Sequence, residues 1–76
     1  MSFARPKTRR AVARALRAAR LAAGFTQREL AARLELSASA ISAMEQGRRG
    51  VSVDELVFIA RALGMDPKAL LTRMLS

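Results

Sequence analysis

The sequence predicts an all-α fold of five short helices. Apolar residues make up 51% of the 76 residues, and many of them are alanine, which favours helix over strand. Apolar positions recur every three or four residues, as is typical of helices, and no segment shows the alternation of a strand. Residues suited to begin a helix stand before five such segments, and these predicted N-caps are Thr8, Thr26, Ser37, Ser52 and Asp66.

The composition limits the functions open to this chain. It contains no cysteine and no histidine, which removes disulfides, thiolate chemistry and the commonest metal ligand and general base. The six acidic residues are scattered, so we expect no metal site, no cofactor and no enzyme activity. No apolar run approaches the roughly 20 residues that a membrane span needs. A formal charge of +8 favours a polyanionic partner, nucleic acid before an anionic membrane.

Basic residues gather at the start of the chain. Residues 1–7 lack helical periodicity and are predicted to form a flexible basic arm, followed by one domain over residues 8–76. The first helix is expected to run from its Thr8 cap to about Ala23 and to end at Gly24. Its predicted buried stripe is Val12, Leu16, Ala19 and Ala23. The first twenty residues hold no acid, and their basic residues are Arg5, Lys7, Arg9, Arg10, Arg14, Arg17 and Arg20.

Residues 26–45 are predicted to form two short helices joined by a tight corner. Thr26 and Glu29 have the spacing of a capping box, in which each side chain bonds to the backbone N–H of the other residue. Ser37 is the predicted cap of the second helix, which leaves Glu35 in the corner. Such a pair leaves one face of its second helix free, and in a helix-turn-helix unit that face enters a DNA groove.

Two further helices complete the predicted domain. Ser52 and Glu55 have the spacing of a second capping box, and Gly64 would end the helix that follows. Asp66 is a cap followed by a proline at the first helical position. The terminal helix is apolar over a wide arc, which suits a place in the core and a dimer interface equally well. The residues of this arc are Leu70, Leu71, Met74 and Leu75.

Three motifs in a fixed order cover most of the chain. They are L-x-x-A-R-x-x-x-G-F-T-Q-x-E-L-A from Leu16 to Ala31, L-S-x-S-x-I-S-x-M-E-x-G from Leu36 to Gly47, and D-E-L-x-x-I-A-R-A-L-G-M-D-P from Asp54 to Pro67. Together they resemble the motifs of the lambda repressor-like helix-turn-helix family, the Cro/Xre group. This resemblance implies a compact five-helix domain that binds DNA in a sequence-directed manner, usually as a dimer on a two-fold site.

The resemblance also implies roles for single residues. The positions that would face the groove are Ala38, Ser39, Ser42 and Ala43. Arg20 and Glu45 would form a structural pair that ties the first helix to the end of the third. Gln27 would hold a phosphate, and Arg48 and Arg49 would grip the DNA backbone from a loop. With the caps and the arm included, the expected phosphate-binding set is Thr26, Gln27, Ser37, Arg48, Arg49, Arg5, Lys7, Arg9 and Arg10.

The chain departs from the family pattern at two places. Glu35 stands at a corner position that is usually glycine because the chain there often needs a positive φ, and a non-glycine residue in that region costs on the order of 1 kcal/mol. The four predicted groove-facing residues include no Arg, Gln or Asn, which are the side chains that make bidentate base contacts. We therefore expect shallow direct readout, with affinity dependent on phosphates, DNA shape and the arm.

The predicted function is a sequence-specific transcriptional regulator of the repressor type, acting on double-stranded DNA as a homodimer. The expected location is the cytoplasm, in association with a nucleoid of prokaryotic or phage type. The alternative is an antitoxin or protein-interaction adaptor on the same fold, with a toxin as partner. A membrane-targeting role conflicts with the core positions that Val12 and Leu16 supply, so no membrane partner is expected.

Overall fold

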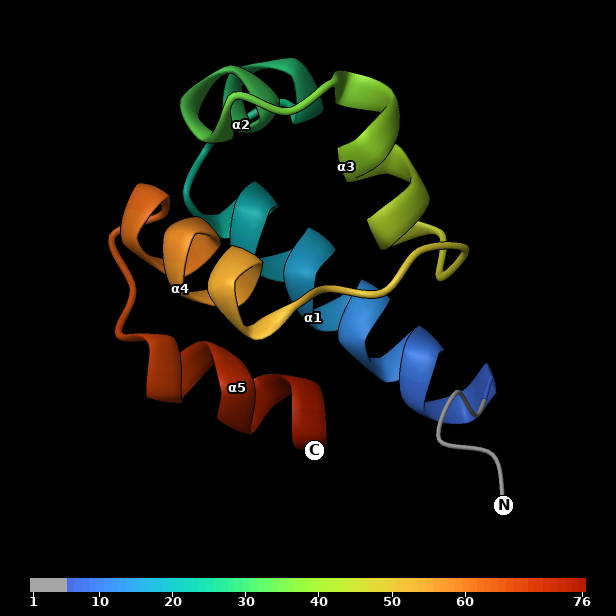
Figure 1. The fold of residues 1–76 in the computed structure, drawn as a ribbon. Coiled ribbons are helices and arrows are strands. Elements are labelled where there is room, and N and C mark those ends of the chain that lie inside the picture. The colour runs from blue at the N-terminus through green and yellow to red at the C-terminus, as the bar shows by residue number, and fades with distance from the viewer. Residues whose placement is uncertain (1–5) are drawn as a thin grey trace.

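Five α-helices make up the part of the chain that the structure describes (Figure 1). This computed structural model describes residues 6–76, with side chains described from Thr8 onward. The helices are α1 (Pro6–Ala22), α2 (Gln27–Leu34), α3 (Ala38–Glu45), α4 (Val53–Ala62) and α5 (Pro67–Leu75). The predicted all-α, five-helix fold is confirmed. Among the helices of the described range, none has the length and apolar character needed to cross a bilayer.

The first helix begins earlier than the sequence predicted. Thr8 is the third residue of α1 and not its cap, because Pro6 occupies the first helical position. Proline suits that position, since its φ is preset for helix and it lacks the backbone N–H that would otherwise stay unbonded there. The arm predicted for residues 1–7 therefore loses its last two residues to α1, and the rest of it, with Arg5, lies outside the described residues.

The four other predicted N-caps are confirmed. The Thr26 hydroxyl accepts a hydrogen bond of 3.0 Å from the Glu29 N–H, and the Glu29 carboxylate accepts one of 2.9 Å from the Thr26 N–H. Ser52 and Glu55 form the same reciprocal pair at the start of α4. Ser37 and Asp66 cap α3 and α5 through their side-chain oxygens. These local bonds fix where each helix begins, and so the direction in which it leaves the preceding turn.

The corner between α2 and α3 is made by a residue in the left-handed region. Glu35 has φ 55° and ψ 37°, and it is the one non-glycine residue with positive φ in the described range. The turn is closed by hydrogen bonds from the Leu36 N–H to the Ala31 carbonyl and from the Glu35 N–H to the Ala32 carbonyl. The positive φ that this corner of the family often needs is thus present, and the chain makes the turn without a glycine.

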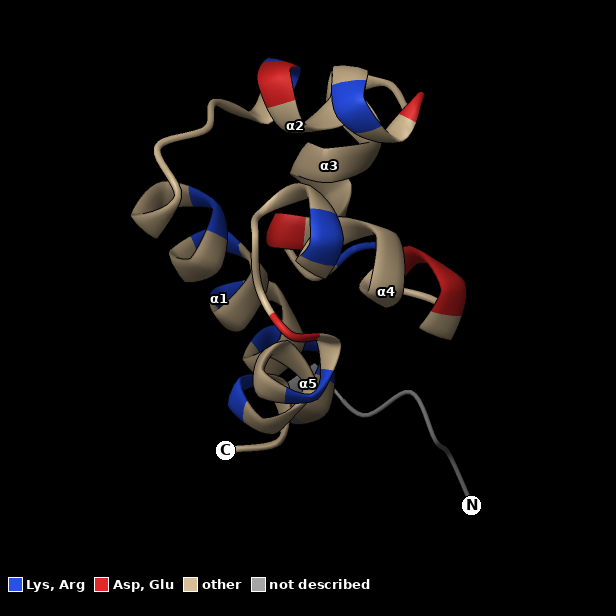
Figure 2. Cartoon of the chain, turned by 90° about the vertical axis from the view of Figure 1, so that its left-hand side faces the viewer, with Lys and Arg blue, Asp and Glu red and all other residues tan. Residues whose placement is uncertain are grey.

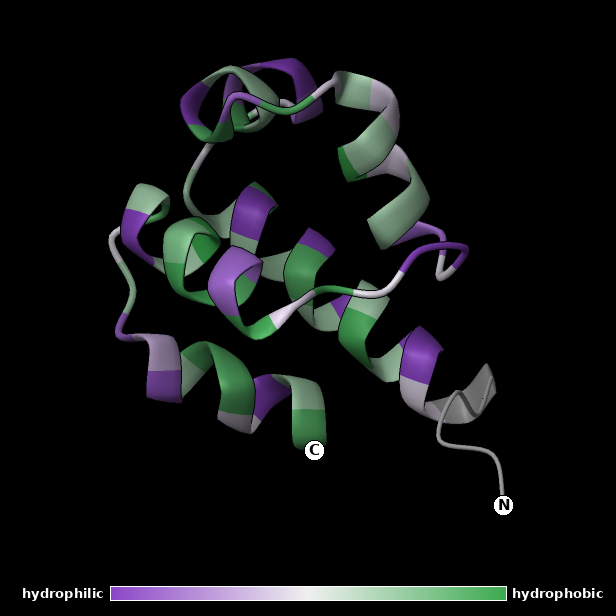
Figure 3. Ribbon diagram, viewed as in Figure 1, coloured by the Kyte–Doolittle hydropathy of each residue, from purple (hydrophilic) through white to green (hydrophobic). Residues whose placement is uncertain are grey.

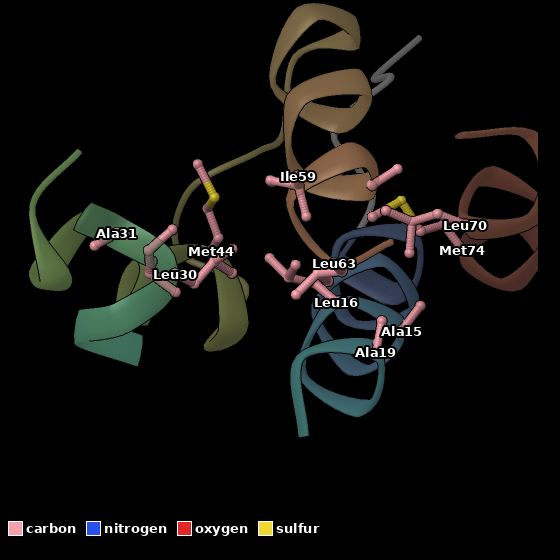
Figure 4. Close-up of a cluster of buried hydrophobic side chains, with 12 residues drawn as sticks. Ala15, Leu16, Ala19, Leu30, Ala31, Met44, Ile59, Leu63, Leu70 and Met74 are labelled. Atoms are coloured by element: carbon pink, nitrogen blue, oxygen red, sulfur yellow. The ribbon is translucent and has the colours of Figure 1, made fainter. Parts of the chain in front are cut away.

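The core is aliphatic and receives side chains from all five helices. The largest fully buried side chains are Leu16, Leu30, Ile41, Met44, Ile59 and Leu70. Figure 4 shows Leu30 and Met44 meeting between α2 and α3, while Leu16 lies beside Leu63 and Ile59. In Figure 3 hydrophilic positions lie on the outer turns of α2 and in the loop after α3, and others are spread over α1, α4 and α5. The helix-turn-helix pair contacts the core through the buried residues Leu30 and Ala31 of α2 and Ile41 and Met44 of α3.

Two predictions about buried stripes need correction. Ala23 is exposed, because α1 ends at Ala22 and the chain has already turned toward Gly24, whose φ is 81°. In α5 the apolar arc divides into two faces. Leu70 and Met74 are buried against the core, whereas Leu71 and Leu75 are 44% and 73% exposed. The core of the same chain already occupies Leu70 and Met74, so only the other two leucines remain available for a dimer contact.

Candidate nucleic-acid interface

The third helix lies at the surface with two unlike sides. Ile41 and Met44 are completely buried and hold its inner side against the core. The four positions predicted to face a groove lie on the outer side, where Ser39 is exposed and Ala38, Ser42 and Ala43 are half-buried. Ala38 also packs partly against the core. The outer side of α3 is thus a shallow surface of small side chains, and Ser39 is the most accessible of the four.

A buried ion pair fixes α3 relative to α1 and α2. Arg20 is 6% exposed, and its Nε and Nη2 atoms donate to the two carboxylate oxygens of Glu45 at 2.6 and 2.9 Å. The third nitrogen, Nη1, donates to the Phe25 carbonyl at 2.7 Å. The hydrogen bonds to Glu45 raise the pKa of Arg20 above its ordinary value. This bidentate arrangement joins the end of α1, the turn before α2 and the end of α3.

Gln27 belongs to the same network. Its side-chain Nε2 donates to Glu45 Oε1 at 3.1 Å, so one of its amide hydrogens is already bonded within the protein. The remaining amide hydrogen and the side-chain carbonyl are the groups that Gln27 has left for a phosphate. The bond to Glu45 also holds the side chain at the N-terminal end of α2.

The N-terminal ends of α2 and α3 differ in charge. Glu29 lies in the first turn of α2, and its hydrogen bonds with Thr26 lower the pKa of its carboxyl, so a negative charge remains there. The first turn of α3 carries no acidic residue. Its cap, Ser37, accepts a bond from the Ala40 N–H at 3.1 Å and lies 3.2 Å from the Ser39 hydroxyl. The positive end of the α3 dipole is therefore the less neutralised of the two.

The basic loop after α3 contains two arginines with different surroundings. Arg48 is exposed, and its Nε donates to the Gln46 side-chain carbonyl at 2.9 Å. Arg49 instead makes a bidentate ion pair with Glu55, at 3.1 and 2.7 Å, and donates to the Gly50 carbonyl. This pairing lowers the pKa of Glu55 to about 2. Both loop arginines were predicted to bind phosphate, but only the charge of Arg48 is not balanced by a carboxylate.

The start of α1 packs against this loop. A Cβ placed on Gly47 would lie 3.5 Å from Arg9 Cγ, and a Cβ placed on Gly50 would lie 3.5 Å from the Arg9 guanidinium carbon. The Arg9 side chain therefore runs along the loop from one glycine to the other, which brings a third basic group beside Arg48 and Arg49. Figure 2 shows further basic segments along α1 and no acidic one. Arg10 is exposed next to Arg9, whereas only the backbone of Lys7 is described.

Gln46 is a polar residue of this surface that the sequence analysis missed. It is exposed at the end of α3, and its Nε2 donates to the Ser42 hydroxyl at 2.9 Å. It follows Ser39 by seven positions and Ser42 by four, which is the spacing of residues on one helix face. This spacing was visible in the sequence, but the predicted reading face stopped at Ala43.

The groove between α2 and α4 lies apart from this surface. Within residues 6–76, no cluster of acidic side chains is arranged to hold a metal ion. A groove of about 590 Å³ lies between the end of α2 and α4. Its lining residues are Arg33, Leu34, Glu35, Leu36, Glu55, Phe58, Arg61 and Ala62, none of which belongs to the predicted DNA-contacting set.

Comparison with known proteins identifies relatives of this architecture. The sequence model of the helix-turn-helix family matches residues 16–70. The clp gene regulator ClgR of Corynebacterium glutamicum is 35% identical, with a TM-score of 0.83 over 90% of this chain and 72% of that chain. An XRE-family like protein from Pseudomonas syringae pv. tomato is 41% identical, with a TM-score of 0.78 over 90% of this chain and 83% of that chain.

A third solved structure is that of a controller protein. The restriction-modification controller protein C.AhdI of Aeromonas hydrophila is 31% identical, with a TM-score of 0.80 over 86% of this chain and 94% of that chain. No match was found among curated protein sequences. A clp gene regulator, an XRE-family like protein and a controller protein thus share this fold and about a third or more of this sequence.

Proposed function

Because the chain belongs to the Cro/C1-type helix-turn-helix family of DNA-binding transcriptional regulators, we propose that it is a sequence-specific, repressor-type regulator that inserts α3 into the major groove. The family and its solved relatives are DNA-binding regulators rather than enzymes. The observation that carries the proposal is the outer side of α3, where Ser39 is exposed while Ile41 and Met44 hold the helix from within. A helix held in this way can enter a groove without unfolding its own core.

Basic groups around α3 are proposed to bind phosphates. Arg48 is exposed and unbalanced by a carboxylate in the described structure, Arg9 runs along the same loop, and Arg10 is exposed beside it. The N-terminus of α3, capped by Ser37 and free of acid, adds the positive end of a helix dipole. Thr26 and Gln27 are proposed to bind phosphate at the N-terminus of α2 in the same way. Phosphate binding by Arg5 and Lys7 remains a prediction from the sequence.

A dimer would place two copies of α3 on one face of the duplex. In a helix-turn-helix dimer the two recognition helices lie about 34 Å apart, one turn of DNA, and so read a two-fold site. Leu71 and Leu75 are the exposed apolar residues of α5 that could join the protomers. Such a dimer on an operator would exclude other proteins from that DNA, which is how it would repress transcription. A chromosomal operator would in turn place the protein in the cytoplasm.

The proposal is tested by fluorescence polarisation with a duplex selected from random DNA by the purified protein, repeated at several salt concentrations. If Arg9, Arg10 and Arg48 each neutralise one phosphate per protomer, a dimer covers about six, and log K should fall against log salt with a slope near −5. The protein should prefer its selected duplex over random DNA by about a thousandfold or more. Equal affinity for both would contradict sequence-specific regulation.

The two loop arginines provide an internal comparison. Arg48→Ala should weaken binding to all duplexes and make the slope shallower by about 0.9 for each lost contact. Arg49→Ala should change the slope less, because its guanidinium is already paired with Glu55 in the free protein. Equal effects of the two substitutions would show that Arg49 leaves Glu55 to bind DNA.

Exposed apolar side chains favour a second candidate, an antitoxin or adaptor that binds another protein. The large exposed apolar residues of the described range are Leu21, Val53, Phe58, Leu71 and Leu75. The discriminating experiment is co-expression with the product of a neighbouring toxin-like reading frame, followed by purification of the pair. A stable complex that forms with the intact protein but not with a Leu71→Glu, Leu75→Glu variant would support this candidate.

A further inference from the structure

Gln46 extends the outer face of α3 by one more turn. Ser39, Ser42 and Gln46 follow one another at i, i+3 and i+7, so their side chains leave the same side of the helix. Gln46 keeps the right-handed helical conformation at the end of α3, with φ −95° and ψ −1°. It is exposed, and it is the only one of the three with a side chain long enough to reach beyond the small residues of that face.

Hydrogen bonds hold the Gln46 amide at both ends. Its Nε2 donates to the Ser42 hydroxyl and its Oε1 accepts from the Arg48 guanidinium, each at 2.9 Å. A glutamine amide has two donor hydrogens and two acceptor lone pairs. One of each is therefore used inside the protein, and one donor and one acceptor remain. The side chain presents a pre-oriented donor–acceptor pair beside the groove-facing residues, with its rotamer already fixed.

We infer that Gln46 reads an adenine in the major groove. This inference rests on the proposed function and identifies the residue that would make a base-specific contact. Adenine offers an acceptor at N7 next to a donor at N6, which matches one free amide N–H and one free amide oxygen. Guanine offers two acceptors, cytosine offers a donor alone, and thymine offers an acceptor beside a methyl group. Gln46 thus supplies the bidentate contact that the four smaller residues of α3 cannot make.

Arg48 and Ser42 act as positioning residues for this contact. Arg48 lies at the phosphate-facing loop and bonds to the amide oxygen, and Ser42 lies on α3 and bonds to the amide nitrogen. Binding of Arg48 to a phosphate would fix the loop relative to the duplex, and so would fix the distance from the Gln46 amide to the base edges. Contact with the DNA backbone through Arg48 and base readout are thereby linked through the Gln46 side chain.

The test is selection of bound sites from random DNA by the wild-type protein and by three variants. Gln46→Ala should lose about tenfold preference for adenine at one position of each half-site and keep preferences elsewhere. Gln46→Glu has the same length but only accepts, so the preference at that position should move toward cytosine, whose N4 amine donates. Gln27→Ala, at the other glutamine of the chain, should lower affinity for all sites without changing any preference.

A modified base gives a second readout on the same duplex. Replacing that adenine by 7-deazaadenine removes N7 but keeps the N6 amine, so it should weaken wild-type binding by no more than Gln46→Ala does, and should not weaken binding of the Gln46→Ala variant. The inference is overturned if Gln46→Ala and Gln46→Glu keep the wild-type preferences, or weaken every site alike. If instead the wild-type protein selects no sequence at all, the proposed function itself has failed, and the inference fails with it.

Discussion

A single buried guanidinium, that of Arg20, joins three helices beneath the proposed DNA-binding face. All of its polar contacts lie within the protein, two to Glu45 and one to the Phe25 carbonyl. An ion pair of this kind adds little stability over a well-packed apolar pair, but removing one partner leaves an uncompensated buried charge. We therefore attribute to the Arg20–Glu45 pair mainly the orientation of the helices. The Glu45 carboxylate also accepts a hydrogen bond from Gln27 at the start of α2.

Glu45→Gln should lower the free energy of unfolding by about 3 kcal/mol, since it keeps the side-chain shape but leaves the Arg20 charge buried without its counter-charge. For a domain of this size the melting temperature should fall by more than about 10 °C. Urea unfolding followed by circular dichroism measures the loss. Glu29→Gln, which alters an exposed carboxylate, is the control and should have the smaller effect. Equal losses would mean that the Arg20–Glu45 pair is no more important than a surface capping contact.

The ion pair between Arg49 and Glu55 predicts how stability depends on pH. Arg49 lowers the pKa of Glu55 from 4.5 to about 2, so the folded state holds this carboxylate ionised where the unfolded state would protonate it. The stabilisation is complete above about pH 5 and disappears as the pH falls toward 2. Glu55→Gln should therefore flatten the decline of unfolding free energy between pH 5 and pH 2.

The neighbouring carboxylate provides the control for this pH effect. Asp54 lies beside Glu55 in the first turn of α4, and its carboxylate makes no ion pair with the side chains described from Thr8 onward. Asp54→Asn should leave most of the decline in place. Identical pH profiles for the wild type and Glu55→Gln would show that the Arg49 contact contributes nothing in solution.

At the level of elements, the corner between α2 and α3 fixes how the helix-turn-helix pair is folded. Glu35 makes this corner with a φ of 55°, where an L-residue brings its Cβ close to the following carbonyl oxygen. The hydrogen bonds of Leu36 and Glu35 back to α2 hold the strained conformation in place. The turn thus has the geometry that glycine would adopt freely, at a local cost in stability.

Glu35→Gly should raise the free energy of unfolding by about 0.5 kcal/mol, because the relief of strain exceeds the added freedom of glycine in the unfolded chain. The matched control is Gly24→Ala, at a φ of 81° where an added Cβ would meet no atom within 4 Å. That change isolates the conformational cost and should destabilise the protein by about 1 kcal/mol. Denaturant unfolding measures the free-energy change of both variants. A loss of stability in Glu35→Gly would contradict the claim that the Glu35 backbone is strained.

The beginnings of the helices were predictable because the responsible bonds are local. Thr26 and Glu29, like Ser52 and Glu55, lie three residues apart, so the sequence alone specifies their contacts. The start of α1 was predicted wrongly, since Pro6 begins the helix before Thr8. The spacing of the four apolar residues of α5 could not tell which are buried and which are exposed. Packing of α5 on α1 decides this.

At the level of the whole molecule, the candidate site depends on contacts that sequence spacing does not reveal. The packing of Arg9 along Gly47 and Gly50 joins the first helix to a loop some forty residues later. The pairing of Arg49 with Glu55 likewise depends on how the loop turns into α4. The family pattern supplied the groove-facing positions, but only the folded chain distinguishes the free Arg48 from its paired neighbour.

Charge is distributed unevenly along the chain. The formal charge of +8 is concentrated in α1, which carries basic residues and no acid, while the acidic residues of α2, α3 and α4 are largely engaged in caps and ion pairs. Unpaired basic side chains also occur on α2, α4 and α5, but Arg9, Arg10 and Arg48 are the ones that lie where the start of α1 meets the loop after α3. A duplex bound across α3 would contact them along its backbone.

The most direct measurement is the change in backbone amide NMR signals of the ¹⁵N-labelled protein when its selected duplex is added. If α3 enters the groove while the loop after it binds the backbone, the largest shifts should fall on Ser39, Ser42, Gln46 and Arg48. The buried side of α5, including Leu70, should be nearly unchanged. Large shifts confined to α4 and α5, with the signals of α3 unmoved, would contradict the account.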